Sequence, residues 1–422
     1  MFDLIGVLAG LLTGWGEDPP PLNPVQPLAW EELTLFSLPH TPEPIIEETV
    51  TTYLQNLSNL GLSPESQGIW LASQWWTFAQ HRGTIPQSAA SLTKLATSLA
   101  ALERYGEDFQ FETVVKHTGT LKNGVLEGDL VIEGGGDPFF VWEEAIALGN
   151  RLNEVGIQQI RGNLIITGDF YMNYEENPQT AAQFLTQALN SQFWSNKIQQ
   201  QYEKLPQETA RPQVQILGKP MIKNQTIPDA KTIIRHESLP LKQILREMNV
   251  YSNNKMSDLI ARSLGGGQTV ANIAAQSAGV SVEEIQLING SGLGLENRIS
   301  PRAAVKILQA MQQKLAQNGG TLAEILPVVQ EGTVRDREIP KGIPVKTGSL
   351  WKVSALAGVI PTNQHGYVYF AIINHDGNLD TFRNFQDQLL KNLDQTWNLE
   401  PLATPSPVKL GDMKRSKLII DN

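Results

Sequence analysis

The stretch Ser91-Leu92-Thr93-Lys94 decides the fold and the chemistry expected of this chain. The apolar residues that follow it recur at helical spacing, and Gly106 supplies a stop, so the sequence predicts a helix that begins at Ser91. Lys94 follows Ser91 at i+3, which lets its amine lie against the serine hydroxyl. A desolvated, unprotonated lysine can take the proton of a serine and make it a nucleophile. The alternative is that Ser91 only caps the helix, a common role of serine.

The pattern S-x-x-K occurs three times, so other motifs have to decide which copy matters. Ser252-Asn253-Asn254-Lys255 and Ser349-Leu350-Trp351-Lys352 also match it. Ser91 stands apart because S-x-N, at Ser252-Asn253-Asn254, and K-T-G, at Lys346-Thr347-Gly348, follow it in that order. These three motifs in this order are the signature of active-site serine penicillin-recognising enzymes. The order therefore favours a catalytic role for Ser91.

Composition describes an ordinary globular protein and excludes several kinds of site. The 422 residues, 41% hydrophobic and 18% charged, suffice for two or three domains with sizeable cores. A net charge of −10 argues against nucleic acid or an anionic membrane as the main partner. The absence of cysteine excludes disulfides, thiolate metal sites and cysteine nucleophiles, and the six histidines lack metal-ligand spacing. The sequence therefore predicts no metal and no cofactor.

The two ends of the chain differ from its body. Residues 2–15 are almost wholly apolar, but they are short for a membrane span and lack the basic start of an ordinary signal peptide. They are interpreted either as an export or anchoring segment or as a packed or disordered N-terminus. A proline-rich linker at 18–27 follows, so residues 1–42 are expected to precede the folded domains. Residues 399–422 carry proline and lysine and are expected to form a loose tail.

The region between the first two motifs changes in texture. Residues 107–238 alternate short β-like runs with turns, with a hairpin signal at Asn123-Gly124, and they are expected to form an inserted α+β domain. The catalytic domain is then discontinuous, made of residues 43–106 and 239–398. In its second part we expect a helix over 252–264, two strands over 353–360 and 367–374, and a closing amphipathic helix from Phe382 to Trp397.

Beyond the three motifs, the sequence resembles the DD-peptidases of the low-molecular-mass class C penicillin-binding proteins over roughly residues 50–395. Residues 133–138 resemble the family's G-x-G-D-P turn, residues 249–254 match its M-N-x-x-S-x-N approach, and residues 346–350 match its K-T-G-S-L element. The resemblance implies an α/β (α+β) fold. A β-lactamase/transpeptidase-like domain, with a five-stranded antiparallel sheet flanked by helices, would carry the smaller inserted domain.

The resemblance also implies a function. The chain would be a serine D-Ala-D-Ala carboxypeptidase acting on peptidoglycan stem peptides, with endopeptidase activity on cross-links as an option, and β-lactam antibiotics would acylate it. Ser91 would attack the carbonyl between two terminal D-alanines, with Lys94 as the base. The N–H groups of Ser91 and Ser349 would form the oxyanion hole. The enzyme would work in the cell envelope or periplasm, attached to the membrane if residues 2–15 form an anchor.

The other implied roles concern proton transfer and substrate binding. Ser252 would relay a proton to the leaving amine and Asn254 would hold the substrate amide, although either could merely cap a helix. Arg337 lies in a segment that resembles a family segment near the substrate side chain, and a surface arginine is the alternative. Lys346 and Thr347 would bind the terminal carboxylate of the substrate. The substrate-binding residues expected on the K-T-G-S element are Lys346, Thr347, Gly348 and Ser349.

Two departures from the family pattern are visible. The family's D-G-S-G-L-S loop reads N-G-S-G-L-G here, which loses a carboxylate at Asn289 and a hydroxyl at Gly294. The interval between Ser91 and Ser252 is short, so a third domain nested in the second is expected to be absent or vestigial.

Two other functions stay open. A related β-lactamase or esterase would need a water-activating base, which no feature marks, and a non-catalytic penicillin- or cell-wall-binding module would need a broken motif. The oligomeric state also stays open.

Overall fold

The computed structural model describes residues 43–419. The predictions for residues 1–42, including the export or anchoring segment, lie outside this range. Within it, no helix combines the length and the apolar character needed to cross a bilayer.

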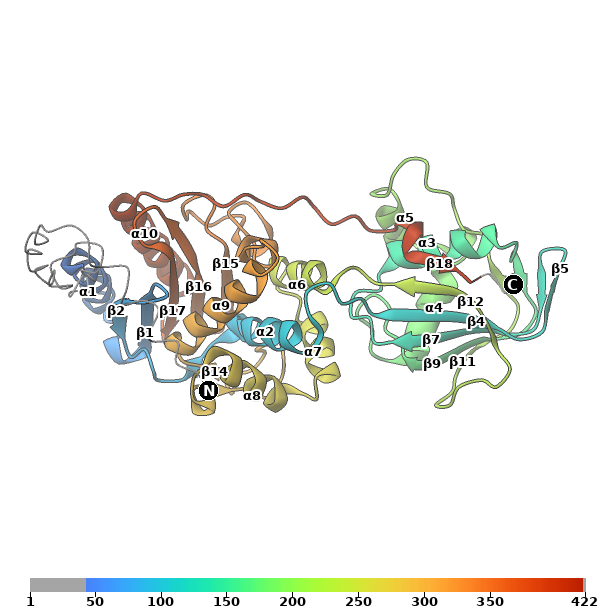
Figure 1. Cartoon of the computed structure of the whole chain (residues 1–422), viewed down its shortest axis with the longest axis horizontal. Coiled ribbons are helices and arrows are strands. Elements are labelled where there is room, and N and C mark those ends of the chain that lie inside the picture. The colour runs from blue at the N-terminus through green and yellow to red at the C-terminus, as the bar shows by residue number, and fades with distance from the viewer. Residues whose placement is uncertain (1–42, 420–422) are drawn as a thin grey trace, which may run out of the picture. The chain divides into compact units, whose positions relative to one another are not determined.

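A five-stranded antiparallel sheet forms the centre of the part of the chain that carries the three motifs, as the resemblance implies (Figure 1). Its strands run in the order β15-β16-β17-β1-β2, so β15, which carries the K-T-G motif, is an edge strand. All ten residues of β16 are buried, which indicates cover on both faces. The strand bounds are β1 Gln67–Ala72, β2 Thr77–His81, β15 Val345–Leu350, β16 Val353–Thr362 and β17 Gly366–His375.

Helices cover both faces of this sheet and enclose two separate cores. Ala355, Ala357 and Val359 of β16 join the core that contains α2, α8 and α9, whereas Leu356 and Ile360 join the core that contains α1 and α10. This alternation is the period of a strand packed on both sides. The helices are α1 Pro44–Asn59, α2 Thr93–Tyr105, α6 Leu241–Val250, α7 Asn254–Ser263, α8 Gly267–Ala278, α9 Pro301–Ala316 and α10 Leu379–Trp397.

The helix starts next to the first two motifs differ from the prediction. Ser91 lies in the 3-10 turn Ala90–Leu92, and α2 begins only at Thr93 with no side-chain cap. Ala90 has a φ of +47°, a left-handed conformation that breaks the backbone just before the serine. The α7 cap is Asn253, whose Oδ1 accepts the Met256 N–H at 3.1 Å. The interpretation of Ser91, Ser252 and Asn254 as helix caps is therefore wrong, and Gly106 ends α2 as predicted.

The inserted region has an α+β fold with its own core, whose buried apolar residues all lie between Val115 and Ile234. Its larger sheet runs in the order β11-β9-β7-β4-β12-β18 and its smaller one in the order β10-β8-β6-β5. The domain boundaries at 107 and 238 stay a prediction. The strands are β4 Glu112–His117, β5 Thr120–Lys122, β6 Val125–Glu127, β7 Leu130–Gly135, β8 Gln159–Ile160, β9 Leu164–Asp169, β10 Gln215–Ile216, β11 Pro220–Ile222 and β12 Lys231–Glu237; the helices are α3 Trp142–Glu154, α4 Pro178–Ala188 and α5 Asn196–Tyr202. Outside the inserted region, a further small sheet joins β3 Gln87–Ser88, β13 Ile285–Gln286 and β14 Arg298–Ile299.

The expectation of a loose tail is wrong for residues 411–418. Strand β18, Ser416–Leu418, pairs antiparallel with β12 at the edge of the inserted sheet (Figure 1). Just before it, Arg415 forms an ion pair with the buried carboxylate of Glu144, which also accepts the Gly411 N–H at 3.0 Å. A strand edge and a buried carboxylate from distant parts of the chain hold this segment, and local composition carries no sign of either.

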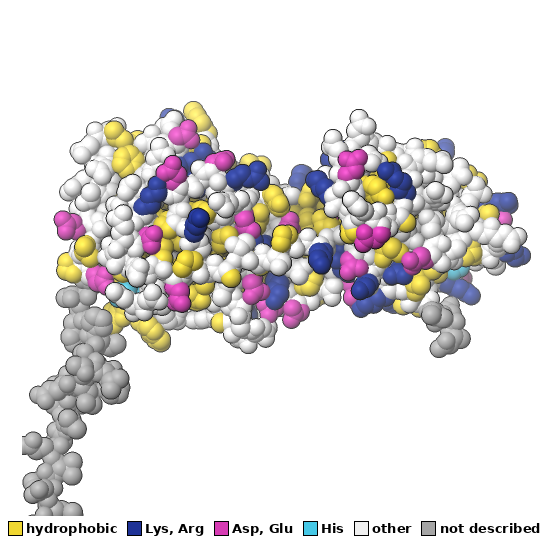
Figure 2. Space-filling view, turned by 90° about the horizontal axis from the view of Figure 1, so that it is seen from above, with side chains coloured by type: hydrophobic (Ala, Val, Ile, Leu, Met, Phe, Trp, Pro, Cys, Tyr) yellow, Lys and Arg dark blue, Asp and Glu magenta, His cyan; other side chains and the backbone are white. Residues whose placement is uncertain are grey.

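The charged side chains of the described residues are mixed by sign on the face seen in Figure 2. Lysines and arginines lie interspersed with aspartates and glutamates over this surface rather than in a basic track. A polyanion such as nucleic acid binds to clustered basic residues, and the face seen in Figure 2 shows no such cluster.

Candidate active site

Lys94 joins the first two motifs in the folded chain. Its side chain is fully buried, and its Nζ lies 2.9 Å from Ser91 Oγ, 2.8 Å from Asn254 Oδ1 and 2.8 Å from the Ser291 carbonyl oxygen. Burial lowers the pKa of Lys94 to about 7, against a smaller opposing effect of the Asp258 carboxylate. At neutral pH a large fraction of this lysine is therefore an uncharged amine.

The three contacts of Lys94 suit an ammonium, which donates to all three oxygens, and they equally suit an uncharged amine. Asn254 Oδ1 and the Ser291 carbonyl can only accept, so they take the two N–H bonds of that amine. The lone pair of the nitrogen then faces the third partner, the Ser91 hydroxyl. The geometry thus places a base against the serine.

Lys346 joins the second and third motifs. It is also fully buried, and its Nζ donates to Ser252 Oγ at 3.0 Å and to the Thr347 carbonyl at 2.9 Å. Burial holds the pKa of Lys346 well below its usual range, and the charge of Lys94 acts in the same direction. Ser252 has a φ of +51°, a strained conformation of the kind that concentrates at functional sites.

Two glycines let the third motif and the 289–294 loop approach the Ser91 turn closely. A Cβ on Gly348 would lie 2.7 Å from the Ala89 carbonyl oxygen, and one on Gly292 would lie 1.9 Å from the Ala90 carbonyl oxygen. Gly292 also has a φ of +81°. Any side chain at either position would push β15 or the loop away from the serine.

Residues that sequence reasoning missed hold the 289–294 loop in place. Thr97 and Ser257 donate to the Gly290 carbonyl at 2.8 and 2.7 Å, and Asp258 Oδ1 accepts the N–H groups of Gly290 and Ser291 at 3.1 and 2.9 Å. Thr97 lies one turn after Lys94, and Asp258 lies four residues after Asn254, so each shares a helix face with a motif residue. That spacing was the available signal.

The departures at Asn289 and Gly294 fit the loop that the structure shows. Asn289 Oδ1 accepts the Gly292 N–H at 2.9 Å, while its Nδ2 donates to the Leu293 carbonyl at 2.8 Å, a bond that a carboxylate could not make. Gly294 has a φ of +110°, which favours glycine over serine.

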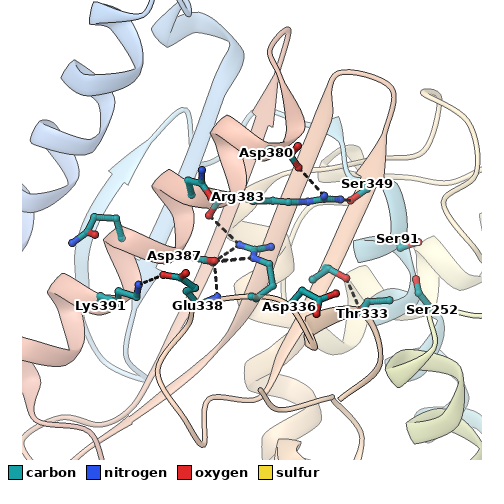
Figure 3. A pocket seen from close by; sticks show the side chains of 14 residues that line it. Ser91, Ser252, Thr333, Asp336, Glu338, Ser349, Asp380, Arg383, Asp387 and Lys391 are labelled. Atoms are coloured by element: carbon teal, nitrogen blue, oxygen red, sulfur yellow. Dashed lines mark hydrogen bonds and ion pairs between the residues drawn. The ribbon is translucent and has the colours of Figure 1, made fainter. Parts of the chain in front are cut away.

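A cavity of about 810 Å³ opens beside the motifs (Figure 3). Ser91, Ser252, Thr347 and Ser349 are among the residues that line it. Thr347 Oγ1 donates to Thr333 Oγ1 at 2.8 Å, which fixes the strand against the 3-10 turn Gly332–Val334. The structure thus brings Ser91, Lys94, Ser252, Asn254 and the K-T-G-S element into one site.

Arg337 lines the same cavity, but its guanidinium is directed at Asp387. Its Nε and Nη2 donate to that carboxylate at 2.9 and 2.6 Å, and both side chains are nearly buried, at 8% and 9% exposure. Its predicted contact with the substrate stays a prediction.

Similarity to known proteins shows the family of this chain. The model of the D-Ala-D-Ala carboxypeptidase 3 (S13) family matches residues 68–199 and 196–396. The chain belongs to this family. It is 23% identical over 429 residues to the D-alanyl-D-alanine carboxypeptidase DacB of Haemophilus influenzae, an alignment that covers 78% of this chain and 88% of that protein.

Solved structures share the fold of this S13 chain. A penicillin G-acylated predatory endopeptidase from Bdellovibrio bacteriovorus superposes with a TM-score of 0.69 at 21% identity, covering 83% of this chain and 99% of the other. Penicillin-binding protein 4 of Haemophilus influenzae gives a TM-score of 0.59 at 21% identity, covering 81% and 98%. These likenesses confirm the transpeptidase-like fold that the motifs implied.

Proposed function

We propose that this S13 chain is a serine DD-peptidase that cleaves the terminal D-Ala-D-Ala bond of peptidoglycan stem peptides through an acyl-enzyme on Ser91. The observation that carries the proposal is the fully buried Lys94 amine, 2.9 Å from the Ser91 hydroxyl, with its other two contacts to pure acceptors. Burial disfavours the ammonium form of this lysine, so its amine can take a proton from the serine that it contacts.

Acylation follows from these contacts. The lone pair of Lys94 takes the Ser91 proton as Oγ attacks the carbonyl carbon between the two D-alanines. The N–H groups of Ser91 and Ser349 stabilise the oxyanion that forms. The C–N bond then breaks, and Ser252 relays a proton to the leaving amine. Asn254, held by its bond to Lys94, presents its amide to the substrate.

Lys346 supplies the positive charge that recognises the terminal carboxylate. Its buried site disfavours the ammonium form until an anion arrives, since burial lowers its pKa. A substrate carboxylate at Thr347 and Ser349 raises that pKa, so the ammonium form and its ion pair appear when the anion binds. Water later hydrolyses the acyl-enzyme by the same proton path in reverse.

The relatives support the reaction class. The Haemophilus relative is a D-alanyl-D-alanine carboxypeptidase, and the similar Bdellovibrio endopeptidase is acylated by penicillin G. Peptidoglycan as substrate implies work in the cell envelope, and penicillins would act as covalent inhibitors.

The decisive experiment is intact-mass measurement of the protein after incubation with benzylpenicillin, followed by peptide mapping. We expect one adduct, on Ser91, and none in Ser91→Ala. A label on Ser252 or Ser349 would overturn the assignment of the nucleophile, because those serines open the other two S-x-x-K sequences. Release of D-alanine from a pentapeptide completes the test of the reaction.

A further inference from the structure

We propose that Glu176 of the inserted region is a positioning residue for the active site, because it keeps the Lys255 ammonium away from the Asp258 carboxylate. Lys255 and Asp258 belong to α7, the helix that begins at Asn254. Glu176 contacts the side of this helix and would act on the reaction through the charge that surrounds Lys94. This inference rests on the proposed function and gives the inserted region a part in it.

One carboxylate of the inserted region holds two cations of α7. Glu176 Oε1 accepts a hydrogen bond from Lys255 Nζ at 2.9 Å, and Glu176 Oε2 forms an ion pair with Arg262. Lys255 and Arg262 are seven residues apart, which is two turns of a helix, so they share one face of α7. Their side chains are 62% and 53% exposed, so packing alone does not fix them. The direction in which they point is therefore set by Glu176.

The backbone just before Glu176 is held in an unusual conformation. Asn173 and Tyr174 have φ values of +53° and +68°, a left-handed pair that is uncommon for residues other than glycine. Such residues persist only where the surrounding structure enforces them, and they concentrate at functional sites. Tyr174 packs against the core to which Met256 of α7 belongs. The turn that presents Glu176 is thus fixed against the same helix that Glu176 holds.

Two other carboxylates, Glu175 and Asp258, lie close enough to act on Lys255. Glu175 is engaged, since its Oε1 accepts a backbone N–H two residues later at 2.8 Å. Asp258 follows Lys255 by three residues on α7, the spacing at which side chains of a helix meet. Its Oδ1 holds the 289–294 loop, whereas its Oδ2 accepts no hydrogen bond from the described residues. A Lys255 released from Glu176 can therefore pair with Oδ2 and leave the loop in place.

The charge of Asp258 matters because it acts on Lys94. The Asp258 carboxylate raises the pKa of Lys94, against the larger lowering by burial. Of the elements that surround the Lys94 amine, α7 carries Asp258 and Lys255, β15 carries Lys346, and the 289–294 loop has no charged side chain. A Lys255 ammonium beside Asp258 would weaken the effect of its carboxylate, so the pKa of Lys94 would fall. The contact between the inserted region and α7 thus helps to set the pH at which the base loses its proton.

The experiment follows the rate of benzylpenicillin acylation from pH 5.5 to pH 9 in the full chain, with each variant normalised to its own plateau. In Glu176→Gln we expect the normalised rate at pH 6 to rise about twofold above that of the wild type, because more Lys94 is uncharged. In Glu176→Gln/Lys255→Gln, which removes the released cation, it should return to the wild-type value. Glu127→Gln, which breaks the exposed ion pair with Arg161 elsewhere in the inserted region, is the matched control and should not differ from the wild type.

A second variant guards against a substitute partner for the lysine. Glu175→Gln/Glu176→Gln removes both carboxylates that the inserted region offers to Lys255, and it should change the normalised rate in the same direction. A purely structural role would lower the plateau and leave the normalised profile unchanged, so an unmoved profile in both variants would overturn the proposal. A Glu176→Gln/Lys255→Gln protein that keeps the profile of Glu176→Gln would also overturn it, because Lys255 would then not be the cation responsible. If the wild-type protein took up no penicillin at any pH, the proposed function itself would fail.

Discussion

Replacing Asp258 by asparagine tests whether Lys94 is the acylation base. The Asp258 carboxylate raises the pKa of Lys94, against the larger lowering by burial that brings it to about 7. Only Oδ1 of Asp258 holds the loop, by accepting the Gly290 and Ser291 N–H groups. An asparagine can keep both of these bonds and remove the charge. The pKa of Lys94 should then fall below its wild-type value.

The direction of the effect on rate follows from the form of the base that reacts. A base works unprotonated, so acylation is lost as the pH falls through the pKa of Lys94. With a pKa of about 7, about 9% of Lys94 is uncharged at pH 6 and about 91% at pH 8, so the rate should rise about tenfold over this interval. In Asp258→Asn the midpoint should move to lower pH, and the rate at pH 6 should be a larger fraction of its plateau.

The assay is the rate of benzylpenicillin acylation from pH 5.5 to pH 9, followed by mass measurement of quenched samples. Lys346 is the second buried lysine of the site, so Lys346→Gln is measured in parallel to separate its titration from that of Lys94. Asp258→Ala, which also loses both loop bonds, shows what a displaced Ser291 carbonyl does. A flat wild-type profile between pH 6 and pH 8, or a midpoint that moves upward in Asp258→Asn, would refute Lys94 as the base.

Three further predictions follow from the same structure. Lys346→Gln should raise the KM for D-alanine release from a pentapeptide at least tenfold and affect a C-terminally amidated analogue much less; equal effects on both would contradict its role with the carboxylate. Burial raises the pKa of Asp137 to about 7, so the stability linked to its proton is present at acid pH and is lost as the pH rises through 7. Asp137→Asn should therefore stabilise the protein at pH 8.5 by up to about 4 kcal/mol, and by less at pH 5. Thermal unfolding at both pH values measures this difference. Removal of residues 412–422 leaves the buried Glu144 without Arg415 and should cost about 3–5 kcal/mol in unfolding free energy, whereas an unchanged melting temperature would show that the tail is not anchored.

Local sequence was enough to predict the elements whose signals are local. The apolar runs of β16 and β17, the stop at Gly106 and the amphipathic α10 all lie close to where the sequence indicated. The order of the motifs was enough to predict that Ser91, Ser252 and Lys346 meet, because the chemistry requires them together. The helix caps, considered as the alternative to catalytic roles for Ser91, Ser252 and Asn254, are wrong, and there is a physical reason why the sequence left that alternative open. A serine before an apolar periodic run looks the same whether its hydroxyl binds a backbone N–H or a lysine.

Contacts between distant segments could not be predicted in this way. The Ser291 carbonyl that binds Lys94 is a backbone group, which leaves no residue signature. Asp258 shares a helix face with Asn254, but the backbone N–H groups that it holds are not marked in the sequence. The pairing of β18 with β12 depends on an open strand edge more than 170 residues earlier in the chain. The cavity wall that α10 forms likewise depends on a contact between distant segments, the Arg383–Ser349 hydrogen bond, although the charged residues of that helix are visible in the sequence.

The two buried lysines of the site give one physical account of how it combines recognition with reactivity. Each has its pKa lowered by burial, so the free enzyme holds two amines in an environment that disfavours a proton on either. A substrate carboxylate near Lys346 stabilises a proton there, whereas Lys94 keeps its contacts with three neutral oxygens. Recognition of the anion and activation of the serine are thus divided between the two lysines. A peptide without that carboxylate would lose the ion pair to Lys346 but meet the same base, so the discrimination should be visible mainly in KM.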